Sequence, residues 1–213
     1  MTDFPQIQRR ELAALVDDLS ALEPQAWRSP TLCGEWDVEE VVAHLGAAAT
    51  TTRLGWIRSM VGARFDTDVH NRRRLEEFRG ADPRETFERF RRVGPIVLPV
   101  KSSPAGLGEL LVHAEDIRKP LGLRHSPDAD GLLAVARFFA TKDFAVNSKT
   151  LVKGLALEAT DADFREGAGP ELRGPLLSLV MVMAGRRPFL ADLDGDGVPE
   201  LTRRLQPGET AEA

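Results

Sequence analysis

The segment GELLVHAEDI, residues 108–117, combines a helical pattern of apolar residues with three polar side chains on one side. On an α-helix, positions i, i+4 and i+7 fall within a sector of about 60°. Glu109, His113 and Asp116 have this spacing. Because the residues around them are apolar, we expect a helix over about 107–120 that turns this polar side toward the interior of the fold.

The pair formed by Glu109 and His113 has two interpretations. The two residues are one helical turn apart, so the ends of their side chains can contact the same metal ion. Carboxylate oxygen and imidazole nitrogen are ligands that suit Zn²⁺, Ni²⁺, Co²⁺ or Fe²⁺. Alternatively, the two groups form a buried ion pair in a purely structural bundle, since burial is unfavourable for them unless they are paired.

The segment WRSPTLCGEWDVEEVVAHLGAAA, residues 27–49, provides a third candidate ligand. Asp37 and Glu40 have the spacing of a capping box, which predicts that a helix begins directly after Asp37. The buried side of this helix includes His44. Together with the later pair, His44 would complete three protein ligands and leave one position open, as in catalytic metal sites. We expect Asp116 to orient an imidazole instead of binding the ion.

The remaining N-terminal segments are also helical in pattern, with apolar residues spaced at threes and fours. Helices are predicted at about 6–22, 66–79, 83–93 and 129–143. After these helices the pattern changes, and TLVKGLALEAT, residues 150–160, alternates in the manner of a strand.

The C-terminal part of the chain has the sequence features of a hairpin and a helix. Gly167 and Gly169 are expected near the turn of the hairpin, and the helix after it should end at Gly185. The chain is therefore expected to fold as a helical bundle followed by a small α/β unit.

Composition excludes several classes of protein. The net charge is −5, so no excess of basic residues indicates nucleic-acid binding. The N-terminus lacks a signal-peptide apolar core, and the longest apolar stretch, 176–184, is shorter than the roughly 20 residues of a membrane span. We expect a cytoplasmic monomer or homodimer that binds neither nucleic acid nor membrane.

The only cysteine of the chain is Cys33. A single cysteine excludes an internal disulfide and a cysteine-based metal cluster. It lies in a segment flanked by Trp27 and Trp36, where a small, buried apolar role is expected instead of a role as nucleophile.

Three stretches of the chain resemble the family of mycothiol-dependent maleylpyruvate isomerase-like proteins. The first is LCGEWDVEEVVAHL, residues 32–45, with a Gly-x-Trp turn before the helix and a histidine near its end, here His44. The second is ELLVHAEDIRKPLG, residues 109–122, which has the pattern Glu-x-x-x-His-x-x-Asp. The third is GLALEATDADFREGAGPELRGPLLSLVMVMAGRRP, residues 154–188, whose Gly-Arg at the end of a helix places the family's functional arginine at Arg186.

This resemblance implies an α+β fold with two domains. Residues 1–146 would form a DinB-like metal-binding four-helix bundle, and residues 147–213 a small, sterol-carrier-protein-like α/β domain. It also implies that His44, Glu109 and His113 are metal ligands, with zinc as the favoured ion and nickel, cobalt and iron as alternatives.

The implied activity is that of a thiol-dependent isomerase or thiol S-transferase whose cofactor is mycothiol. A metal-bound thiolate would add to a small electrophile, and in a maleylpyruvate-type reaction rotation about the resulting single bond would precede loss of the thiol. Arg186 would stabilise negative charge on the substrate oxygens. Without the resemblance, Arg186 has the pattern of an arginine that compensates a helix C-terminus. The alternative function is that of a non-catalytic, metal-binding or regulatory DinB-like protein.

Overall fold

The computed structural model describes residues 2–62, 66–97, 104–144 and 146–206. The chain forms two compact units, Met1–Pro127 and Asp128–Ala213. We expected the boundary between residues 146 and 147, but it lies before helix α7 (Ala129–Thr141) and not after it. The reason is packing: the apolar side of α7 is buried against α9 (Leu176–Met183), within the second unit.

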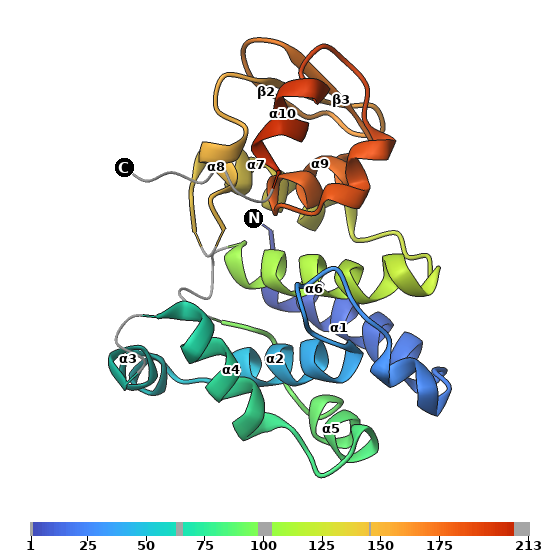
Figure 1. The fold of residues 1–213 in the computed structure, drawn as a ribbon, viewed down its shortest axis with the longest axis vertical. Helices are drawn as coiled ribbons and strands as arrows, with labels where there is room; N and C mark the ends of the chain where they lie inside the picture. The colour runs from blue at the N-terminus through green and yellow to red at the C-terminus, as the bar shows by residue number, and fades with distance from the viewer. Residues whose placement is uncertain (1, 63–65, 98–103, 145, 207–213) are drawn as a thin grey trace. The chain divides into compact units, whose positions relative to one another are not determined.

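The first unit is helical (Figure 1). Its elements are α1 (Phe4–Ser20), the 3₁₀ helix η1 (Pro24–Arg28), α2 (Val38–Thr50), α3 (Arg53–Gly62), α4 (Thr67–Phe78), α5 (Pro83–Phe90) and α6 (Ala105–Leu121). The helices expected in this range are present, with ends shifted by a few residues. Helix α3 was not predicted.

Helices α1, α2, α5 and α6 share one apolar core, and α4 packs against α2. The fully or nearly fully buried members of this core are Leu15, Leu19, Trp27, Val38, Val41, Val42, Leu45, Phe90, Ile96, Leu110, Ala114 and Ile117. Helix α2 contacts α4, α5 and α6, so it lies at the centre of the bundle (Figure 1). This arrangement confirms the predicted fold class of a helical bundle followed by a small α/β unit.

The first turn of α2 is closed by the predicted capping box. The Asp37 carboxylate accepts the Glu40 backbone N–H at 2.9 Å, and the Asp37 backbone N–H donates to the Glu40 carboxylate at 3.0 Å. Because the box sets where the helix begins, it also sets which residues face α6. His44 is one of them, and it is buried.

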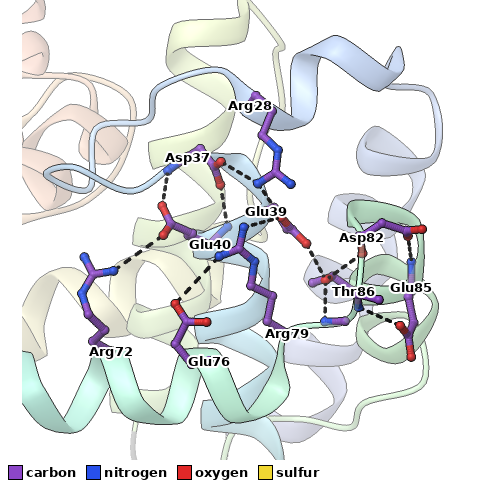
Figure 2. A network of polar contacts seen from close by, with 12 residues as sticks. Arg28, Asp37, Glu39, Glu40, Arg72, Glu76, Arg79, Asp82, Glu85 and Thr86 are labelled. Carbon is purple, nitrogen blue, oxygen red and sulfur yellow. Dashed lines mark hydrogen bonds and ion pairs between the residues drawn. The ribbon is translucent and has the colours of Figure 1, made fainter.

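A buried carboxylate joins α2 to two neighbouring elements and to the segment that follows α4 (Figure 2). Glu39 has no exposed surface. Its carboxylate contacts Arg28 of η1 at 2.6 Å and Arg79, which follows α4, at 2.9 Å, and it accepts the Thr86 hydroxyl of α5 at 2.8 Å. Since a buried carboxylate is stable only when it is paired, these contacts fix the position of α2 in the bundle.

The second unit contains a small mixed sheet (Figure 1). Besides α7 and α9, its elements are α8 (Ser148–Leu151), β1 (Ala156–Ala159), β2 (Arg165–Gly167), β3 (Glu171–Gly174), the 3₁₀ helix η2 (Arg187–Asp192) and α10 (Val198–Arg204). The strand order is β2-β1-β3, with β1 antiparallel to β2 and parallel to β3. The strand predicted within 150–160 is therefore shorter than expected, because its first residues belong to α8.

The predicted position of the hairpin turn is wrong. The turn lies between β1 and β2, whereas Gly167 and Gly169 carry the chain from β2 across to β3 on the other side of β1. Both have positive φ, +82° and +129°. A Cβ at Gly167 would lie 2.2 Å from the carbonyl oxygen of Leu155, and one at Gly169 would lie 2.1 Å from that of Gly154. This crossover therefore requires glycine for close backbone approach.

Substitution of Glu39 tests how strongly this carboxylate stabilises the bundle. We expect Glu39→Gln to lower the free energy of unfolding by about 2 kcal/mol, because two arginines lose their anionic partner and keep at most a hydrogen bond to a neutral acceptor. Glu76→Gln is the matched control: Glu76 is half-exposed and contacts the same Arg79 at 3.8 Å, so its loss should be below about 0.5 kcal/mol. Urea unfolding monitored by circular dichroism measures the free energy of unfolding of both variants. Equal decreases would contradict the stabilising role of the Glu39 carboxylate.

Candidate metal centre

Helices α2 and α6 bring His44, Glu109 and His113 together. The Nε2 atom of His44 lies 2.8 Å from Oε1 of Glu109, and Nε2 of His113 lies 3.4 Å from the same oxygen. One ligand atom from each residue lies within 4.8 Å of the other two. Two imidazoles and one carboxylate therefore converge on one point.

The cluster is largely buried. His44 and His113 are each 8% exposed, and the side chain of Glu109 is 28% exposed. The two imidazole rings meet edge to face, with their centroids 4.9 Å apart and an interplanar angle of 74°. Partial exposure at Glu109 leaves the cluster in contact with solvent, so a small ion can reach it.

Asp116 forms a hydrogen bond with the His113 imidazole on the side away from Glu109. Its Oδ2 atom lies 2.9 Å from Nδ1 of His113, and the residue has no exposed surface. A carboxylate at this position holds a proton on Nδ1, so Nε2, which faces Glu109, is the nitrogen that an ion can bind after displacing its proton. The orienting role of Asp116 stays a prediction, and this contact is the geometry that it requires.

The charged groups of the cluster shift one another's pKa values. Burial alone would lower the pKa of His113, but the charge of Glu109 and the hydrogen bonds that His113 makes to Asp116, Cys33 and Glu109 outweigh it and raise that pKa well above its ordinary value. Burial would likewise raise the pKa of Glu109, but His113 and His44 hold it well below its ordinary value. The two pKa values are shifted in opposite directions, as expected when an imidazolium and a carboxylate stabilise each other.

The donor set fits a divalent ion. Two imidazole nitrogens and one carboxylate oxygen form a typical catalytic set with one position open, and the acid that orients His113 is already in place. Within the described parts of the chain, neither of the other two histidines belongs to such a group. His125, for example, bonds to Glu11 at 2.7 Å.

Cys33 is a member of this site that the sequence did not indicate. It packs at the edge of the bundle core, as expected, but it is only half-buried. Its sulfur lies within 4.8 Å of a nitrogen of His113 and an oxygen of Asp116. Cys33 and His113 are far apart in the sequence, so no local spacing could have linked them.

Trp36 is the second neighbour of the cluster from the same segment. Its ring lies 5.0 Å from the His44 ring, at an interplanar angle of 44°. The sequence analysis assigned Trp36 no contact with a candidate ligand.

Arg186 lies in the second unit, directly after α9. It is half-buried, and its guanidinium donates to the carbonyl of Ala184, the C-terminal capping residue of α9. Its backbone N–H donates to the carbonyl of Met181 at 2.9 Å. These contacts match the helix-end role that the sequence pattern alone indicated.

These features define a two-unit α+β protein with a candidate His-Glu-His metal centre between two helices of its bundle. Residues 8–98 match the sequence profile of the mycothiol maleylpyruvate isomerase N-terminal domain. This match relates the N-terminal part of the chain to that domain family. The matched range includes His44 but ends before Glu109 and His113.

Solved structures show the same fold over both units. Two crystal structures of mycothiol-dependent maleylpyruvate isomerase, one of them a mutant with a histidine replaced by alanine, superpose with a TM-score of 0.63 at 14% sequence identity. Each match covers 92% of this chain and 96% of the other. No curated protein sequence matches the chain. Among the described residues, no helix combines the length and apolar character that a membrane span requires.

Metal titration at several pH values tests the centre. We expect one Co²⁺ or Zn²⁺ ion per chain, with an affinity that rises about tenfold per pH unit, because the ion must displace the proton on His113. The dependence should flatten once the pH exceeds the raised pKa of His113. Calorimetry in buffers of different ionisation enthalpy measures both the affinity and the released proton.

The control is His125, which lies outside the cluster. His44→Ala and His113→Ala should each lose binding, whereas His125→Ala should retain it. Binding that survives the loss of His44 would show that the three residues do not share one ion.

Proposed function

We propose that this protein is a metal-dependent and mycothiol-dependent enzyme that isomerises a small electrophile or transfers the thiol to it. The convergence of His44, Glu109 and His113 between α2 and α6 is the observation that carries the proposal. The N-terminal domain family and the fold shared with maleylpyruvate isomerase support it. Zinc is the favoured ion for two imidazoles and one carboxylate.

Each residue of the cluster would have a distinct task. When bound, a divalent ion with an open position lowers the pKa of a thiol enough to supply thiolate near neutral pH. His44, Glu109 and His113 would hold that ion. Asp116 keeps the proton of His113 on Nδ1, 2.9 Å away, and so directs Nε2 inward. Burial of both imidazoles limits the water that surrounds the ion.

Arg186 is proposed as the fixed cation of the reaction. Negative charge develops on the substrate oxygens when a thiolate adds to a conjugated double bond, and a guanidinium can stabilise it. The support for this role is the family resemblance of the Gly-Arg pair at the end of α9.

Calorimetry with mycothiol tests the proposed cofactor. We expect metal-loaded wild-type protein to bind mycothiol with measurable heat, and metal-stripped protein to give none, because the thiol sulfur would have no ion to bind. The His44→Ala variant, stripped of metal and then incubated with the metal ion again, should also give no heat of mycothiol binding. Equal mycothiol binding with and without the metal, or no binding to the metal-loaded protein, would favour a non-catalytic metal-binding protein instead.

Replacement of Arg186 tests the proposed cation. We expect Arg186→Ala to lose at least about 100-fold in mycothiol-dependent turnover of maleylpyruvate, with its metal content intact. Arg187→Ala is the matched control, since Arg187 is the next residue and is exposed. Absorbance of the product measures turnover, and elemental analysis measures the metal. Unchanged turnover of Arg186→Ala would reject the role.

A further inference from the structure

The segment that leads into α2 forms a tight turn. The backbone N–H of Trp36 donates to the carbonyl of Cys33 at 3.2 Å, and Gly34 between them has φ of +60°. The hydroxyl of Thr31 donates to the carbonyl of Trp36 at 2.8 Å and accepts the backbone N–H of Cys33 at 3.1 Å. These bonds hold the side chains of Cys33 and Trp36 at the two ends of one rigid turn.

The turn is attached to α6 beside the cluster. The backbone N–H of Leu32 donates to the carbonyl of Asp116 at 3.1 Å. The carboxylate of the same Asp116 bonds to Nδ1 of His113, and the sulfur of Cys33 lies within 4.8 Å of both residues' ligand-type atoms. The thiol and the carboxylate therefore approach the same imidazole.

The other end of the turn lies against the other imidazole. The Trp36 ring is 5.0 Å from the His44 ring, which is itself 4.9 Å from the His113 ring. An indole at this distance restricts rotation of the His44 side chain. In a closely packed interior, most other rotamers of His44 would clash with a neighbouring ring.

We infer that the turn from Cys33 to Trp36 positions both imidazoles of the candidate metal centre, Cys33 through His113 and Trp36 through His44. The inference rests on the proposed function, in which both imidazoles bind the ion. Side chains already held in one orientation lose less conformational entropy when an ion binds, so the affinity is higher. Outer groups of this kind typically contribute about tenfold to 100-fold in metal affinity.

Cys33 acts as a positioning residue and not as a ligand. Its sulfur is grouped with His113 and with Asp116, the residue that bonds Nδ1. In the described residues it forms no such group with His44 and Glu109, which lie at the Nε2 side where the ion would be held.

Cobalt binding to turn variants tests the inference. We expect Cys33→Ala and Trp36→Leu each to weaken Co²⁺ binding about tenfold and to shift the visible d–d spectrum, since each frees one imidazole. Cys33→Ser and Trp36→Phe keep a small polar group and an aromatic ring, so they should restore most of the affinity. Glu35→Ala is the matched control, because Glu35 is exposed in the same turn and should leave affinity and spectrum unchanged.

The outcomes separate this inference from the proposed function. Wild-type affinity and spectrum in both Cys33→Ala and Trp36→Leu would overturn the positioning role alone. A sulfur-to-cobalt charge-transfer band in the wild type that disappears in Cys33→Ser would make Cys33 a ligand and would also overturn it. A wild-type protein that binds no cobalt would overturn the metal centre and this inference together. Far-UV circular dichroism shows whether each variant is folded.

Discussion

The structure of the first unit depends on one carboxylate, Glu109, which contacts one imidazole across a helix–helix contact and a second imidazole on its own helix. Glu109 of α6 approaches both His44 of α2 and His113 of its own helix. Burial of three such groups is unfavourable unless they are paired, so α2 and α6 must meet in a single register for these contacts to form. An ion at the same point would satisfy all three groups and displace the proton of His113.

Two further sets of contacts set this register. At the start of α2, the capping box and the paired carboxylate of Glu39 tie the helix to η1, α5 and Arg79 (Figure 2). Before it, the turn from Cys33 to Trp36 contacts both imidazoles. The polar contacts around α2 thus form two sets, a structural one at Glu39 and one at the candidate centre. The pKa values of Glu109 and His113, both in the centre, are strongly shifted. Such shifts are typical of functional sites.

Fold and function rest on different observations in this protein. The similarity to maleylpyruvate isomerase covers most of both chains but has 14% identity, so it establishes the architecture. The profile match relates residues 8–98 to the N-terminal domain family of these isomerases. A shared fold can host unrelated activities, so the proposal of thiol chemistry depends on the ligands that α2 and α6 place together.

The sequence by itself determined the features that depend on neighbours within a few residues. Helical periodicity put Glu109, His113 and Asp116 on one side of α6, and the capping box located the start of α2. Tertiary structure alone decided which unit receives α7, the crossover at Gly167 and Gly169, and the approach of Cys33 and Trp36 to the imidazoles. The physical reason is range: hydrogen bonds within a helical turn leave a repeating pattern in the sequence, whereas packing between distant segments depends on how whole elements fit together.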